Sequence, residues 1–271
     1  MFLKLMKHEL KATGRIQGIL AASSLGVSLL GTLLLYLAQP LQGENLAVEI
    51  LSILLFPTVL LSLVGCSAAS WILVCYRFYR NKFTDEGYLT FTLPVTADQL
   101  IWSSYLTMLL WGLVSTLVLL GGVMLFLGTA IQTALEGEMS VFQLMQVIWE
   151  NTLGLQLADP EISSYVGLSA ASAVIGNLAG FLSVMMAIAL GCAAAKKHKL
   201  LASFGIAYGI NVLVGTLQST VTLTVGASLG LSGVGAPLWI GPAFQLVVSL
   251  ALGLISYLTL RHLMGKKLNL N

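Results

Sequence analysis

Two short serine motifs are the first residues whose types and spacing could support catalysis. Residues 226–230 (GASLG) fit the GxSxG nucleophile elbow, and residues 230–233 (GLSG) resemble the GxSG of intramembrane serine proteases. A serine nucleophile needs a base within hydrogen-bond reach. Each histidine of the chain lies beside a basic cluster, on what we predict below to be the other side of a membrane: His8, His198 and His262. We interpret both motifs as chance matches and expect no enzyme.

The residues required for ATP hydrolysis, metal binding and ion coupling are also absent from the expected patterns. No Lys is followed by Ser or Thr, so a GxxxxGK[ST] phosphate-binding loop cannot occur and ATP hydrolysis is not expected of this chain. The three cysteines have neither CxxC nor Cys/His spacing, so we predict no metal, no cofactor and no disulfide framework. The predicted spans hold no ionisable group in their interiors, only Ser, Thr and four amides expected to bond between helices: Asn177, Asn211, Gln218 and Gln245.

Composition and charge placement predict a membrane protein. Of 271 residues, 57% are hydrophobic and 9% are charged, against about 25% charged in a soluble domain. Five charge-free stretches lie between the charged clusters: 16–43, 50–76, 99–135, 162–195 and 200–260. A helix needs roughly 20 apolar residues to cross the hydrocarbon core, and the last stretch is long enough for two. We predict an all-α integral membrane protein with a single transmembrane domain, 1–271, and six spans: about 16–37, 50–75, 100–128, 166–194, 201–224 and 240–260.

The basic residues predict the orientation of these spans. All thirteen Lys and Arg fall in four clusters, at 4–15, 77–82, 196–199 and 261–267, which six spans place on one side. The other side carries only acidic charges. Because Lys and Arg are retained in short cytoplasmic loops, we predict a multi-pass protein of the cell inner or plasma membrane with both termini in the cytoplasm.

The segments outside the spans have their own patterns. Residues 1–15 place apolar and basic side chains on different sides of a helix wheel, which favours an amphipathic interfacial helix contacting membrane lipids over a frayed basic tail. Residues 132–162 form the largest outer loop, with a short surface helix expected after Ser140. The glycine-rich outer connection 226–239 could re-enter the membrane. The spacing of Gly176 with Gly180, and of Gly205 with Gly209, indicates close helix packing, within the chain or in a dimer.

The cytoplasmic segment 76–99 is too long and too varied for a simple turn. Helix connections in bundles need only 2 to 8 residues, whereas this segment mixes charged and aromatic side chains. Thr96 with Gln99 forms a predicted capping box that opens the third span after Pro94. We therefore predict a short structured element between spans two and three.

Residues 83–100, FTDEGYLTFTLPVTADQL, carry a family resemblance. An acidic residue, a glycine, a leucine and then Leu93-Pro94-Val95-Thr96 resemble the stretch between spans two and three of the type-2 ABC exporter permeases. The six-span outline, the amphipathic start and the apolar connection between spans five and six are similar to that family too, although six-span topology alone is shared by unrelated transporters.

The resemblance implies a permease subunit of an ATP-driven exporter whose cytoplasmic element docks on a separate ATP-binding subunit. The residues it implies for that contact are Asp85, Glu86, Gly87, Tyr88, Leu89 and Phe91, with Arg77 and Arg80 in support. The other reading of these aromatics is membrane-interface anchoring.

The resemblance further implies a second permease chain, identical or related, and no nucleic-acid partner. Substrates of the family include peptides, lipid-like molecules and drugs, and nothing in the sequence selects among them. The alternatives are a non-transporting membrane scaffold or sensor, and an ion-coupled secondary transporter, which the absence of intramembrane charge disfavours.

Overall fold

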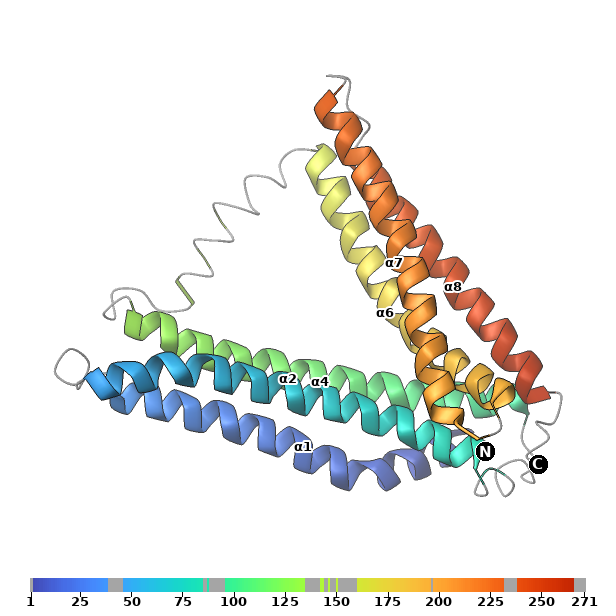
Figure 1. The fold of residues 1–271 in the computed structure, drawn as a ribbon, viewed down its shortest axis with the longest axis horizontal. Helices are drawn as coiled ribbons and strands as arrows, with labels where there is room; N and C mark the ends of the chain where they lie inside the picture. The colour runs from blue at the N-terminus through green and yellow to red at the C-terminus, as the bar shows by residue number, and fades with distance from the viewer. Residues whose placement is uncertain are drawn as a thin grey trace. The chain divides into compact units, whose positions relative to one another are not determined.

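The protein is built from long helices. The computed structural model describes residues 2–38, 46–84, 87, 96–134, 142–143, 146, 150, 160–195, 197–231 and 238–265. Among them it has six long helices (Figure 1), namely α1 (Phe2–Ala38), α2 (Leu46–Phe83), α4 (Ala97–Ala134), α6 (Pro160–Ala194), α7 (Lys199–Leu231) and α8 (Ile240–Gly265). No strand occurs in these residues. The all-α prediction is confirmed.

All six helices are long and apolar enough to cross a membrane. The qualifying segments are Lys4–Ala38, Val48–Phe83, Ala97–Ile131, Ile162–Ala194, Lys199–Thr224 and Ile240–Gly265. Each contains one of the predicted spans, so six helices able to cross a membrane occur where spans were predicted; the limits of the spans stay a prediction. The 37 residues of α1 measure about 55 Å at 1.5 Å per residue, well beyond the roughly 30 Å of a hydrocarbon core.

The helix ends differ from the predicted span limits. Residues 2–15 are not a separate element, because α1 runs without a break from Phe2 to Ala38. That these residues lie along the membrane surface stays a prediction. Likewise α2 continues to Phe83, where Arg80 and Lys82 in its last turn are favourably placed near the helix C-terminus. Residues 226–231 of the predicted outer connection belong to α7.

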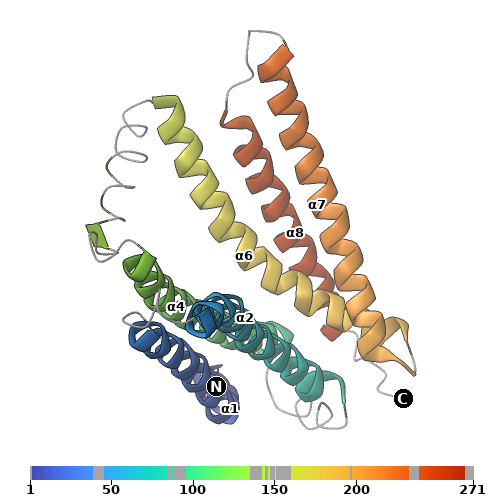
Figure 2. The same ribbon diagram turned by 60° about the vertical axis from the view of Figure 1, so that its left-hand side comes forward.

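The chain divides into two compact units. The α1–α2–α4 bundle comprises Lys4–Val74 with Thr107–Leu153, and the C-terminal bundle comprises Met1–Leu3, Cys75–Leu106 and Gly154–Asn271. In the first, α1, α2 and α4 run side by side (Figure 2). In the second, α6 packs against both α7 and α8. Because α2 and α4 each belong partly to both units, residues 75–83 and 97–106 are described with the C-terminal bundle. The predicted single transmembrane domain stays a prediction.

The α1–α2–α4 bundle has an apolar core near the far end of α1. Leu35 of α1, Val59 and Leu63 of α2, and Phe126 of α4 are each at most 5% exposed. The ring of Phe56 lies 5.8 Å from that of Phe126. Without a hydrophobic driving force between helices in lipid, such contacts hold the bundle by close packing.

In the C-terminal bundle, α6 and α7 approach each other closely at Gly191 and Ser203. A Cβ added to Gly191 would lie 2.5 Å from the backbone N and Cα of Ser203, so only glycine allows this approach. The Ser203 hydroxyl donates to the carbonyl oxygen of Lys199 at 2.8 Å, and its contact with that of Ile188 is 3.3 Å. Of the glycine pairs noted in the sequence, Gly176 faces Ser249 of α8, so it packs within the chain.

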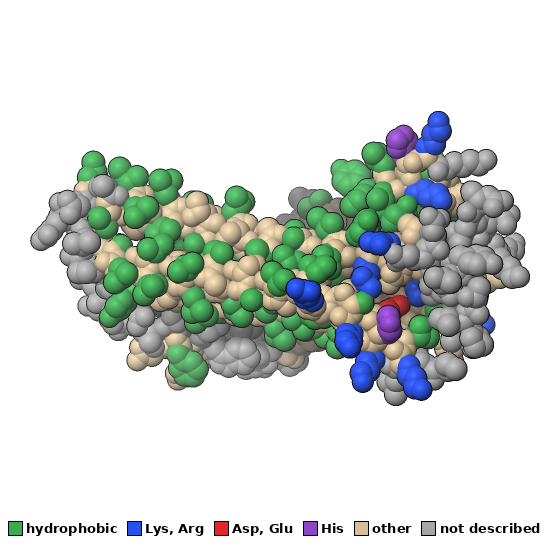
Figure 3. Space-filling model, turned by 90° about the horizontal axis from the view of Figure 1, so that it is seen from below, with side chains coloured by type: hydrophobic (Ala, Val, Ile, Leu, Met, Phe, Trp, Pro, Cys, Tyr) green, Lys and Arg blue, Asp and Glu red, His purple; other side chains and the backbone are tan. Residues whose placement is uncertain are grey.

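Much of the outward surface of the helices is apolar. Leu61, Leu201 and Leu223 are each more than 70% exposed. Hydrophobic side chains cover much of the face shown in Figure 3. An exposed apolar surface of this extent is expected of helices that contact lipid.

Candidate functional site

Only one of the six predicted ATPase-contact residues is described by the structure. Gly87 is described, and the other five lie outside the described residues: Asp85, Glu86, Tyr88, Leu89 and Phe91. Their role in binding a partner stays a prediction. What the structure adds is how the two ends of this segment are held.

Gly87 makes a tight turn immediately after α2. Its N–H donates to the carbonyl oxygen of Thr84 at 2.7 Å. A Cβ at this position would lie 2.6 Å from the carbonyl oxygen of Lys82, closer than real Cβ contacts come. The Thr84 hydroxyl donates to the carbonyl oxygen of Arg80 at 2.6 Å and so satisfies one carbonyl of the last turn. Glycine at position 87 is therefore required by the backbone, apart from any contact with a partner.

The end of α2 is packed rather than frayed. Phe83 is 2% exposed, and its ring meets that of Phe78 edge-on at 5.7 Å. Lys82 is 1% exposed. Of the two predicted supporting residues, Arg80 is exposed and Arg77 is half-buried, with a buried Nε that has no hydrogen-bond partner in the described part of the chain. The segment thus starts from a buried helix end.

The beginning of α4 is fixed by the predicted capping box. The N–H of Thr96 donates to Oε1 of Gln99, and the N–H of Gln99 donates to the Thr96 hydroxyl, both at 3.4 Å. These reciprocal bonds satisfy two N–H groups at the start of the helix. The capping-box prediction is confirmed.

Asp98 ties this helix start to α8. Its Oδ1 accepts a hydrogen bond from the Tyr257 hydroxyl at 3.0 Å and lies 3.3 Å from Nε of Arg261. Tyr257 and Arg261 are four residues apart, so they share one face of α8. Trp102, one turn after Asp98, places its ring 6.1 Å from that of Tyr257. From the sequence, Asp98 was expected to lie in the cytoplasmic segment 76–99, and no partner was predicted for it.

A set of polar contacts joins α1 to α4 in the α1–α2–α4 bundle, and we call it the polar ladder. The Thr107 hydroxyl is 3.3 Å from Oε2 of Glu9, and Nε1 of Trp111 donates to the Thr13 hydroxyl at 2.8 Å. Each contact joins residues 98 positions apart in the sequence. The two helices are therefore parallel at this interface and in fixed register.

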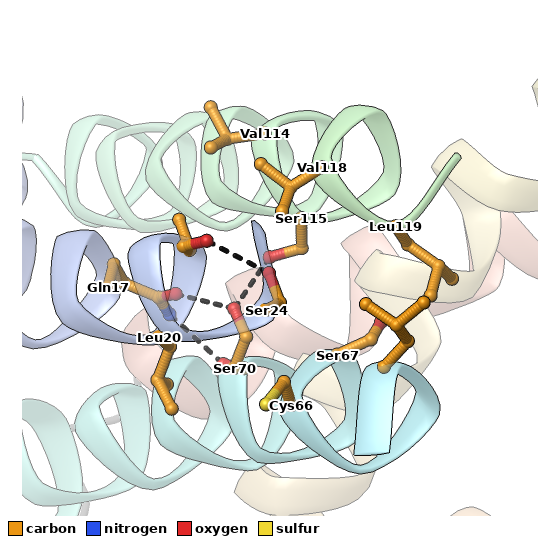
Figure 4. A pocket seen from close by; sticks show the side chains of 12 residues that line it. Gln17, Leu20, Ser24, Cys66, Ser67, Ser70, Val114, Ser115, Val118 and Leu119 are labelled. Carbon is orange, nitrogen blue, oxygen red and sulfur yellow. Dashed lines mark hydrogen bonds between the residues drawn. The ribbon is translucent and has the colours of Figure 1, made fainter. Parts of the chain in front are cut away.

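The third rung of the polar ladder also includes α2 (Figure 4). Nε2 of Gln17 donates to the carbonyl oxygen of Ser70 at 3.0 Å, and the Ser70 hydroxyl donates back to Oε1 of Gln17. The Ser70 and Ser115 hydroxyls are 2.6 Å apart. Gln17 is 2% exposed and Ser70 4%. In lipid such bonds hold helices together, and this one joins all three helices of the bundle.

Sequence reasoning missed the polar ladder, although its spacing is visible. Glu9, Thr13 and Gln17 repeat every four residues, as Thr107, Trp111 and Ser115 do. Two of the amides that were expected to form hydrogen bonds between helices donate within their own helix instead. Asn177 donates to the carbonyl oxygen of Ala173 and Asn211 to that of Ala207, both within their own helix. That expectation is wrong for these two donors, since an exposed amide finds the carbonyl one turn back.

No group of three His, Cys, Asp or Glu side chains that could hold a metal ion occurs among the described residues. The comparisons with known proteins give no further guide. No known protein family, curated protein or solved structure matches the chain.

Proposed function

We propose that this chain is the permease subunit of an ATP-driven exporter of the type-2 ABC kind, with no ATPase activity of its own. In this proposal residues 85–91 contact a separate ATP-binding subunit, and a second permease chain completes the path. Both termini lie in the cytoplasm, and the membrane is the cell inner or plasma membrane. The exported molecule belongs to the peptide, lipid-like or drug classes.

One observation carries the proposal: the segment that resembles the family's coupling element lies between two anchored helix ends. The turn at Gly87 and the buried Phe83 hold its start, and the capping box and Asp98 hold its end. An element that passes a partner's movement to membrane helices needs such rigid attachment at both ends, because a frayed end would absorb the movement. Through Tyr257 and Arg261, a displacement at Asp98 reaches α8 as well.

The exposed face of α1 supports the proposed orientation. Glu9, Thr13 and Gln17 turn one face of the helix toward α4, and the cations lie on another face, all of them exposed: Lys4, Lys7, Lys11 and Arg15. Cations near a span favour the cytoplasmic side and attract anionic headgroups at about 1 kcal/mol each near the surface. Replacing the four cations by Gln is expected to lower the phosphatidylglycerol that co-purifies with the protein. Replacing the three lysines by Arg, which keeps the charge, is expected to leave it unchanged.

A co-purification experiment tests the assignment. The chain is expressed with the ATP-binding subunit encoded beside it, and the complex is captured through a tag on the permease. The expected result is a stable complex that is lost in the variants Glu86→Lys and Leu89→Ala. Lys197→Glu is the matched control, since Lys197 is an exposed cation of another predicted cytoplasmic loop, and this variant is expected to keep the partner.

Two results contradict the proposal. The first is absence of the ATP-binding subunit from the purified wild-type chain. The second is a complex that drives no ATP-dependent export in sealed vesicles, which is the outcome expected of a scaffold or sensor. Transport by a proton or sodium gradient without the ATP-binding subunit would instead indicate a secondary transporter.

A further inference from the structure

A small polar cavity lies at the third rung of the polar ladder, between α1, α2 and α4. Its volume is about 20 Å³. The polar side chains that line it come from all three helices (Figure 4), and they are Gln17, Ser24, Cys66, Ser67, Ser70 and Ser115. Leucine, valine and alanine side chains line the rest. This is an unusual lining for the interior of a membrane bundle, where unmet polar groups are costly.

Counting hydrogens shows which polar atoms at the cavity have bonding capacity left. The Ser70 hydroxyl gives its one hydrogen to Oε1 of Gln17, so in the 2.6 Å contact it must accept from the Ser115 hydroxyl. Ser115 therefore keeps its oxygen lone pairs for a further donor. Gln17 uses one amide hydrogen on the Ser70 carbonyl and keeps its second.

Two further serines complete this set. The Ser24 hydroxyl gives its hydrogen to the carbonyl oxygen of Ala21 at 2.9 Å and keeps its lone pairs. Ser67 makes no hydrogen bond to any described residue, so both its hydrogen and its lone pairs are open. Donors from Gln17 and Ser67 and acceptors from Ser24 and Ser115 thus line one small space.

We propose that this cavity is a binding site for a single ordered water molecule that bridges α1, α2 and α4. A buried water needs about 10–15 Å³ and two to four polar partners, and both conditions are met here. The water accepts from Gln17 and Ser67 and donates to Ser24 and Ser115. A cation is disfavoured because no carboxylate lines the cavity, and a volume of about 20 Å³ matches that needed by one water.

Radiolytic hydroxyl labelling of the full-length chain in lipid nanodiscs tests the site. Radiolysis of a bound water produces hydroxyl radical next to the lining residues Leu63 and Cys66. We expect Cys66 to be oxidised severalfold faster than Cys75, another half-buried cysteine of α2 that does not line the cavity. In ¹⁸O-enriched water, the label is expected in the oxidised product. Equal oxidation of Cys66 and Cys75 in the parent chain would overturn the proposal.

A cavity-filling variant separates a water-filled cavity from a dry one. Ser67→Val adds apolar volume and removes the hydroxyl, whereas Ser52→Val is the control at another half-buried serine of α2, outside the cavity. With water present, Ser67→Val expels it and leaves the second amide hydrogen of Gln17 without an acceptor. Cys66 oxidation then falls to the level of Cys75, and the unfolding midpoint drops below that of Ser52→Val. A midpoint above that of the control, or unchanged oxidation, is the result expected of a dry cavity and contradicts the proposal.

Discussion

Replacing Gln17 by Met tests whether the polar ladder holds the α1–α2–α4 bundle together. Met has a similar length and no hydrogen-bonding group, so Gln17→Met removes both bonds to Ser70 while keeping the side-chain volume. Hydrogen bonds between membrane helices contribute about 0.6 kcal/mol on average and about 1.7 at most. Two such bonds predict a loss of about 1 to 3 kcal/mol in the free energy of unfolding.

The matched control is Gln245→Met on α8. Gln245 is exposed and makes no hydrogen bond to a described residue, so its replacement is expected to change the free energy of unfolding by less than about 0.5 kcal/mol. The assay is reversible unfolding in mixed micelles with increasing SDS, followed by tryptophan fluorescence. The same SDS range is used for the parent chain and both variants.

A double-mutant cycle isolates the Gln17–Ser70 contact. Gln17→Met, Ser70→Ala and the double variant are compared with the parent chain, and residues in direct contact are expected to couple by at least about 0.5 kcal/mol. Coupling near zero, or equal losses for Gln17→Met and Gln245→Met, would refute the reasoning, because the two bonds would then contribute no more than a lipid-facing amide.

Three further substitutions test other contacts of the structure. Gly191→Leu is expected to lower the unfolding midpoint strongly, because its side chain would meet the backbone of Ser203, whereas Gly205→Leu, where a Cβ meets nothing within 4 Å, is expected to be nearly neutral. Gly87→Ala is expected to weaken capture of the ATP-binding subunit while leaving six spans intact by accessibility mapping, since the turn after α2 must shift. Asp98→Asn is expected to cost no more than about 1 kcal/mol, and less at high salt, because both side chains of its ion pair with Arg261 are well exposed; a large, salt-independent loss would contradict this.

The main architecture could be predicted because the membrane constrains it strongly. Charge-free stretches of at least 20 residues have few alternatives to a spanning helix. The capping box at Thr96 was predictable for another reason. Its two side chains lie three residues apart in the sequence, so the motif can be recognised without knowing the packing of the helices. Helix ends such as Phe83 were not predictable, because basic residues are compatible both with the last turn of a helix and with a loop.

The contacts between helices could not be derived from the chain alone. Asp98 could have paired with any cation on the same side, and only the packing of α4 beside α8 selects Tyr257 and Arg261. The role of Gly87 was inferred from a resemblance, whereas its need for a glycine follows from the backbone of Lys82, which the sequence does not reveal. Serines such as Ser67 gave no signal, because a hydroxyl in a span bonds equally well within its own helix.

The most direct test of the proposed coupling to an ATP-binding subunit is photo-crosslinking in living cells from position 86. Glu86 is replaced by a benzophenone amino acid, cells are irradiated, and the adducts are identified by mass spectrometry, with position 150 of the predicted outer side as the matched control. The account predicts an adduct with an ATP-binding protein from position 86 and none from position 150. Adducts from position 86 to outer-surface proteins, or to lipid alone, would contradict it.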